Sequence, residues 1–275
     1  VRRIGCEGSG TEPHDSKGPP MHRAGAHIRK KFHAREDAQC ARRHNRQIVP
    51  LQIWSIGLGR AMPMNMLIFT PQALAFVAIP KTGTTAIEQA LRPHADIVFR
   101  GARKHISTKR FHRRVRPFIS ETFDVALESF AVLREPEDQI RSWYKYRTRD
   151  EIRDKPEYSG HLTFEEFVEA LLSETPPPCT QIGSQLRMLS GRGGRLLIDH
   201  LFAYERWDRL ETYLSDRFEQ RITFEPRNVS PQVPTELSEQ TRARLRVARA
   251  AEFDLHARLM ESDGKLAPRQ AKAAV

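Results

Sequence analysis

Residues 80–85 of this 275-residue chain read PKTGTT and follow the apolar run LAFVAI. A helical pattern comes next, and the start of a helix favours anions because its first N–H groups lack intrahelical partners and its dipole is positive there. Lys adds a full charge, Gly lets the backbone approach closely, and Thr hydroxyls can donate hydrogen bonds. We therefore predict a phosphate-binding loop formed by Pro80, Lys81, Thr82, Gly83, Thr84 and Thr85.

The glycine spacing of an ATP-binding loop is missing from this segment. Such a loop reads GxxxxGK[ST], with Lys after the second Gly, whereas Lys81 precedes Gly83 and the preceding apolar run has no Gly. An ordinary ATP-binding kinase loop is therefore disfavoured. The alternative is a plain strand-to-helix turn that Thr85 merely caps, which leaves Lys81 and Thr82 unexplained.

A second group of anion-binding residue types lies in VLREPEDQIRSWY, residues 132–144. Arg134 ends an apolar run and offers a fork of N–H donors that suits a phosphate. Ser142 follows eight residues later, one to two turns into the expected helix. The alternatives are a surface ion pair of Arg134 with Glu135 or Glu137, and an exposed Ser142 without a role.

Together the two segments resemble the donor-binding signatures of sulfotransferases that use 3′-phosphoadenosine 5′-phosphosulfate (PAPS). In that family the loop binds the 5′-phosphosulfate, and the Arg with a Ser eight residues later holds the 3′-phosphate. The segments SQLRML, FAYERW and NVSP are similar to parts of the Golgi-type and bacterial branch. The resemblance spans roughly residues 70–260. It implies a P-loop-like three-layer α/β domain, PAPS as donor, and no metal.

The resemblance also implies the reaction, which is transfer of a sulfuryl group to an acceptor hydroxyl. Lys81 is expected to neutralise charge on the departing nucleotide. The acceptor must lose a proton, and relatives often place a His or Glu base between the two signatures. We expect His105, in a loop before Ser107, to be that base, because the patterns around His94 and His112 predict solvated side chains. An exposed loop histidine without a role is the alternative.

The elements that must position these residues alternate between strands and helices. Strand patterns lie at residues 73–80, 95–99, 129–135 and 195–205, with amphipathic helices between and after them. This order predicts the α/β class, with a central parallel sheet flanked by helices. Parallel strands end at one edge of a sheet, so both signatures are expected there. Residues 236–262 are predicted to form one long terminal helix.

Capping signals predict where three helices start. Thr85 with Glu88, and Thr163 with Glu166, have the spacing of a capping box. Ser107 is predicted to cap a helix that follows it.

The formal net charge of +11 arises mostly from residues 1–65, which hold 12 Lys and Arg and five acidic residues. This segment lacks apolar periodicity, so we predict a disordered basic leader before an α/β domain at residues 66–275. The alternative is that translation begins near Met62. A nucleic-acid partner is disfavoured, because the leader has few aromatic residues. The apolar patch at residues 48–59 is shorter than the roughly 20 residues that span a bilayer.

The three cysteines show no CxxC spacing, which indicates neither a disulfide framework nor a zinc site and favours the cytoplasm. The acceptor is expected to be a hydroxyl of a carbohydrate or small molecule. The basic residues 109–116 could attract an anionic glycan, although such runs are usually solvated surface. Two alternatives stay open: an ATP-dependent kinase or phosphotransferase, for which no Walker B acid is evident, and a relative that binds nucleotide without turnover.

Overall fold

A mixed sheet of six strands forms the centre of the described part of the chain. The computed structural model describes residues 66–99, 106–225 and 232–267. In sheet order the strands are β3 (Ile97–Phe99), β1 (Met66–Phe69), β2 (Leu74–Phe76), β4 (Glu128–Leu133), β5 (His200–Ala203) and β6 (Lys265–Leu266). The predicted leader at residues 1–65 and His105 lie outside the described residues.

The directions of the strands confirm the α/β class and show a sheet that is only partly parallel. Neighbours β2, β4 and β5 are parallel, whereas β1, β3 and β6 pair antiparallel with their neighbours. The chain passes from β1 to β2 through a tight turn in which the Ala73 N–H donates to the Thr70 carbonyl at 3.1 Å. A turn this short permits only antiparallel pairing, because a parallel crossover needs a dozen or more residues.

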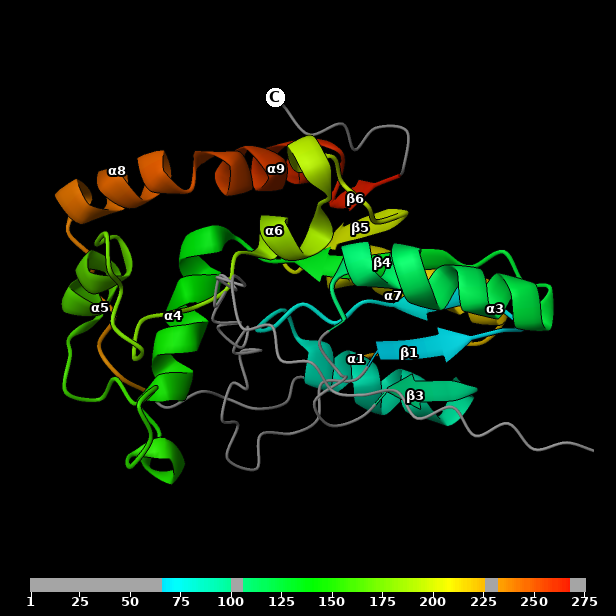
Figure 1. Cartoon of the computed structure of the whole chain (residues 1–275), viewed down its shortest axis with the longest axis horizontal. Helices are drawn as coiled ribbons and strands as arrows, with labels where there is room; N and C mark the ends of the chain where they lie inside the picture. Colours follow the sequence, from blue (N-terminus) through cyan, green and yellow to red (C-terminus); the bar gives the residue numbers. More distant parts are fainter. Residues whose placement is uncertain (1–65, 100–105, 226–231, 268–275) are drawn as a thin grey trace, which may run out of the picture. The chain divides into compact units, whose positions relative to one another are not determined.

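Helices cover both faces of the sheet, as Figure 1 shows. On one face of the sheet, Phe111 and Leu255 pack in the same cluster as Val77. On the other face, Ile87 and Leu214 pack against residues of β2 and β4. A third cluster joins α4, α5 and α8. The helices are α1 (Thr84–Leu91), α2 (Thr108–Arg110), α3 (Arg116–Phe123), α4 (Pro136–Arg147), α5 (Phe164–Leu171), α6 (Gln185–Leu189), α7 (Trp207–Phe218), α8 (Glu239–Ala248) and α9 (Ala250–Glu261).

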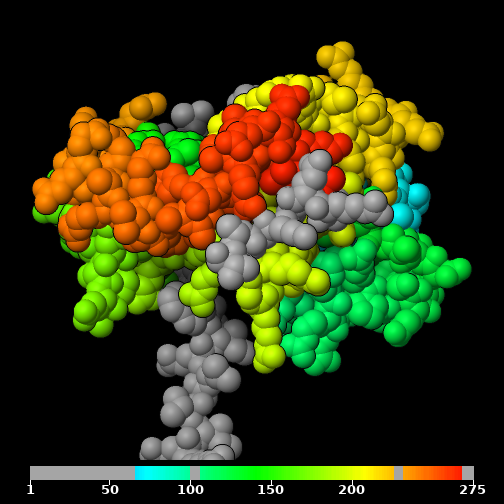
Figure 2. Space-filling view, turned by 90° about the horizontal axis from the view of Figure 1, so that it is seen from above, coloured from blue at the N-terminus to red at the C-terminus, as the bar shows by residue number. Residues whose placement is uncertain are grey.

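Two of the helix predictions were wrong. Helix α1 begins two residues earlier than a Thr85 cap would place it, with Gly83 as its N-cap and no side-chain capping bond, and Glu88 pairs with Arg92 at 3.4 Å instead. The single helix predicted at residues 236–262 is two helices, α8 and α9, which meet at Arg249, where φ is −115°. Figure 2 shows them, orange to red, along one face of the domain. Within the described ranges, every helix is too short or too polar to cross a bilayer.

The predicted capping box of α5 is confirmed. The Glu166 N–H donates to the Thr163 hydroxyl at 3.2 Å, and the Thr163 N–H donates to the Glu166 carboxylate at 2.7 Å. We expect Thr163→Ala to lower the free energy of unfolding by about 1 kcal/mol in urea titrations, because one N–H of the first turn loses its acceptor. The matched variant Thr212→Ala removes an exposed hydroxyl from inside α7 and should stay within about 0.5 kcal/mol of wild type. Equal losses would contradict the capping role.

Candidate functional site

The loop at residues 80–85 joins β2 to α1 at the edge of the sheet where the parallel strands end. Its backbone is unusual, because both Lys81 and Gly83 have a positive φ, of 68° and 73°. Gly83 is also closely packed: a Cβ added there would lie 2.4 Å from Cζ2 of Trp207 and 3.2 Å from Cε2 of Tyr204. Only glycine fits this position, and the rings of Tyr204, just after β5, and of Trp207, at the start of α7, pack against the loop.

The three threonines of the loop do not have equal roles. Thr82 is fully buried, and its hydroxyl donates to the Ile79 carbonyl at 2.8 Å. That proton is therefore not available to an anion, and the prediction of a donated hydrogen bond from Thr82 is not supported in this conformation. Thr84 is buried in the first turn of α1, and Thr85 is half-buried beside it. The backbone N–H groups at the helix start remain the main anion donors of the segment.

Arg134 lies directly after β4, and its side chain reaches the loop. Nη1 donates to the carbonyl oxygen of Lys81 at 3.3 Å, and Nε donates to Asp138 at 2.6 Å. The acidic partner of Arg134 is thus Asp138, four residues later in the chain, and not Glu135 or Glu137. The guanidinium group stacks 4.2 Å from the centre of the Tyr204 ring. Nη2 also lies 2.6 Å from Asp138, so these contacts engage three of the five N–H donors of the arginine and two remain for a phosphate.

Helix α4 turns one face toward the loop, and Ser142 lies on it. Near the helix start, Gln139 donates to the Pro80 carbonyl at 3.1 Å. Two turns later, the ring of Tyr146 lies 4.0 Å from Nζ of Lys81. Residues three and four apart share a helix face, so the half-buried Ser142 stands between these two contacts. The structure therefore brings together Pro80, Lys81 and Arg134, and it places Ser142 on the helix face that contacts the loop.

The amine of Lys81 lies among aromatic rings and other cations. The centre of the Trp143 ring is 5.4 Å from Nζ. Burial, followed by the guanidinium groups of Arg149, Arg134 and Arg147, lowers the pKa of Lys81 to about 7. Among the described residues no carboxylate offsets this effect. A bound anion is favoured beside these cations, because it restores the charged form of the lysine.

Several residues of this site were not assigned a role from the sequence. Gln185, almost fully buried, holds the backbone of Arg134 on both sides, accepting from its N–H at 3.0 Å and donating to its carbonyl at 2.9 Å. Tyr204 and Trp207 form the aromatic wall under the loop. The segments SQLRML and FAYERW, which hold these residues, were the available signal.

The two histidines that the structure describes between the signatures lie in different surroundings. His94 is exposed and contacts Gln220, in agreement with a solvated side chain. His112 is half-buried, and its Nε2 donates to the Leu197 carbonyl, so its prediction as a solvated residue was wrong. Burial is the largest cause that lowers the pKa of His112.

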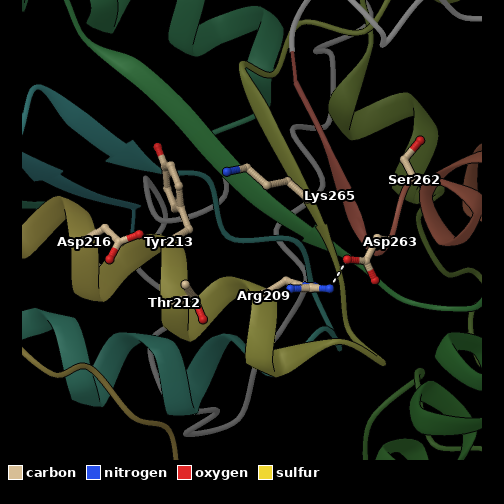
Figure 3. Close-up of a pocket in the computed structure, with 7 residues that line it drawn as sticks. All are labelled: Arg209, Thr212, Tyr213, Asp216, Ser262, Asp263 and Lys265. Atoms are coloured by element: carbon tan, nitrogen blue, oxygen red, sulfur yellow. Dashed lines mark hydrogen bonds and ion pairs between the residues drawn. The ribbon is translucent and has the colours of Figure 1, made fainter.

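A cavity of about 330 Å³ lies elsewhere, between α7 and residues 262–265 (Figure 3). Figure 3 shows Arg209 and Asp263 as an ion pair across it, with Lys265 beside the ring of Tyr213. No loop residue lines this cavity, so it is separate from the candidate site. In the described part of the chain, no three His, Cys, Asp or Glu side chains are grouped as metal ligands.

The contacts at the edge of the sheet connect the two sequence signatures through two hydrogen bonds, from Arg134 to Lys81 and from Gln139 to Pro80. Gln139 and Tyr146 join α4 to the same loop. Comparison with protein-family models, with curated proteins and with solved structures gave no match to the chain.

Proposed function

We propose that this chain is a PAPS-dependent sulfotransferase built on a P-loop-like α/β domain. The observation that carries the proposal is the hydrogen bond from Arg134 to the carbonyl of Lys81, at 3.3 Å. Two segments that lie more than 50 residues apart in the sequence, and that each resemble a donor-binding signature, thereby form one cationic surface. A single nucleotide with phosphates at both ends would contact both segments.

Each part of the donor would meet a different group of residues. The loop from Lys81 to Gly83 and the start of α1 offer backbone N–H groups and a positive dipole end to the 5′-phosphosulfate. Arg134 and Ser142 would hold the 3′-phosphate through a charged fork and a hydroxyl. Asp138 competes for the same guanidinium group, and it would orient the fork before the nucleotide arrives.

The proposed reaction forms a bond from the acceptor oxygen to sulfur as the bond from sulfur to the bridging phosphate oxygen breaks. Negative charge grows on the departing 3′-phosphoadenosine 5′-phosphate (PAP), and Lys81 is placed to offset it. The acceptor proton passes to a general base, for which His105 is our candidate. The acceptor is a hydroxyl compound, and a carbohydrate or a small molecule fits this reaction.

Thermal unfolding with nucleotides tests this function. We expect PAP to raise the melting temperature more than ATP with magnesium does, because only a ligand of the folded state stabilises it, by about 2.7 kcal/mol at a concentration of 100 times Kd. Arg134→Ala should lose most of the PAP shift, and Ser142→Ala part of it. Arg153→Ala is the matched control, because its exposed side chain contacts Asp150 and Tyr158, which lie outside both signatures.

The opposite pattern would favour another function. A shift with ATP and magnesium but none with PAP would contradict the proposal and favour a kinase or phosphotransferase. A PAP shift without any transfer from PAPS to hydroxyl acceptors would favour a nucleotide-binding relative that has no turnover.

A further inference from the structure

Two cations lie near the ring of Tyr146, which stands near the end of α4. One comes from the loop and the other from the residues that follow the helix. Nζ of Lys81 lies 4.0 Å from the centre of its ring, and Cζ of Arg149 lies 5.3 Å from it. Beside them, the Trp143 side chain is buried, and its indole N–H has no hydrogen-bond partner among the described residues. Two cations, an aromatic ring and an unused donor therefore gather in one place.

In the described part of the chain, the two arginines at this place differ in their partners. Arg147 is a structural cation, because it is buried and donates to the carbonyls of Pro178 at 3.1 Å and Gln181 at 2.7 Å. Arg149 differs, since it is half-buried and no ion pair joins it to a carboxylate in the described part of the chain. Burial raises the pKa of the Tyr146 phenol, and among the charges that act on it Arg149 has the largest effect, ahead of Glu151 and Glu157.

The position of this group relative to Arg134 limits what it can bind. Tyr146 is eight residues beyond Asp138, the partner of Arg134, and a helix rises about 1.5 Å per residue, so roughly 12 Å of α4 separates the two. The group therefore lies about two helical turns from Asp138, one turn beyond Ser142, and next to the amine of Lys81. An acceptor must approach the sulfuryl group beside that amine.

We propose that Lys81, Tyr146 and Arg149 form an acceptor subsite for a hydroxylated ring that carries a carboxylate, such as a uronic acid. The inference rests on the proposed function, because only a sulfuryl acceptor needs to stand beside Lys81. The ring stacks on Tyr146, and the carboxylate pairs with the guanidinium group of Arg149 in the fork geometry that arginine favours. A neutral ring leaves Arg149 without a counter-charge.

A matched pair of sugars tests the subsite. We would measure the affinities of 4-nitrophenyl β-D-glucuronide and 4-nitrophenyl β-D-glucoside by titration calorimetry, with the full chain and saturating PAP. Both carry the same aromatic group, so their ratio isolates the carboxylate. We expect the glucuronide to bind about tenfold tighter. Arg149→Gln should bring the ratio close to one, whereas Lys145→Gln, a charge loss at the residue before Tyr146, should preserve it.

The outcomes separate this inference from the proposed function. Equal affinities for the two sugars, or no measurable binding of either, would overturn the subsite, and so would a ratio that Arg149→Gln leaves unchanged. PAP binding is measured first in the same titrations. Loss of the glucuronide preference with intact PAP binding would refute the subsite alone, whereas a preference in a chain that does not bind PAP would refute the sulfotransferase assignment alone.

Discussion

Between about pH 7.5 and pH 9.5 the affinity of the wild-type chain for PAP is expected to fall by up to about tenfold per pH unit, and Lys81→Met should abolish this fall. The pKa of Lys81 is lowered to about 7, so above that pH the amine is mostly neutral before ligand binds. A bound phosphate favours the ammonium form, so binding takes up one proton. The phosphates of PAP stay ionised over this range, because their second pKa is near 6.

The same lysine should change the stability of the ligand-free chain, with a sign that follows from the pKa. The pKa of Lys81 falls from 10.5 to about 7 on folding, so the cost of burying its charge is fully present below pH 7 and disappears as the pH rises toward 10.5. Lys81→Met should therefore stabilise the chain most at about pH 6 and hardly at all at about pH 10.5. Urea titrations at both values measure this.

Lys145→Met is the control variant. It removes a positive charge, as Lys81→Met does, but from a lysine that does not belong to the buried cluster around the loop. Its effect on stability and on PAP affinity should not vary with pH in this way. A PAP affinity that is constant with pH in the wild type, together with no proton uptake in buffers of different ionisation enthalpy, would show that Lys81 is charged before binding and does not face the nucleotide.

The sequence was informative where one local rule decides the structure. The Thr163–Glu166 capping box, the strand before the loop and the helix that contains Ser142 each depend on neighbouring residues, and the structure has all three. Strand β1 was missed because a four-residue run gives little periodicity, although all its residues are buried. The break at Arg249 was missed because the charged pattern continues through it, and only packing separates α8 from α9.

The candidate site was only partly predictable, for a related reason. Lys81 and Arg134 could be chosen from residue type and their places after apolar runs. The contact of Lys81 with Tyr146 depends on how α4 lies against the loop, which no spacing within either segment encodes. The hydroxyl of Thr82 bonds within the loop, and composition alone cannot distinguish an internal partner from a ligand.

Gly83→Ala is expected to lower the free energy of unfolding by about 2 to 4 kcal/mol and to abolish stabilisation by PAP. Two costs add here. Gly83 has a φ of +73°, which L side chains rarely adopt, and its new Cβ would meet the Trp207 ring at 2.4 Å and 2.5 Å. A rigid ring cannot swing aside as a flexible side chain does, so the loop itself must move, and the N–H groups at the start of α1 move with it.

Gly193→Ala separates the two costs. Gly193 also has a positive φ, of 65°, but a Cβ added there meets nothing within 4 Å, so only the backbone cost of about 1 kcal/mol applies. Trp207→Leu combined with Gly83→Ala should recover at least about 1 kcal/mol relative to the sum of the single variants, because the collision is then removed. Equal losses for Gly83→Ala and Gly193→Ala, or additive effects with Trp207→Leu, would mean that the ring does not hold the loop, and the geometry proposed for the donor site would then have no support from β5.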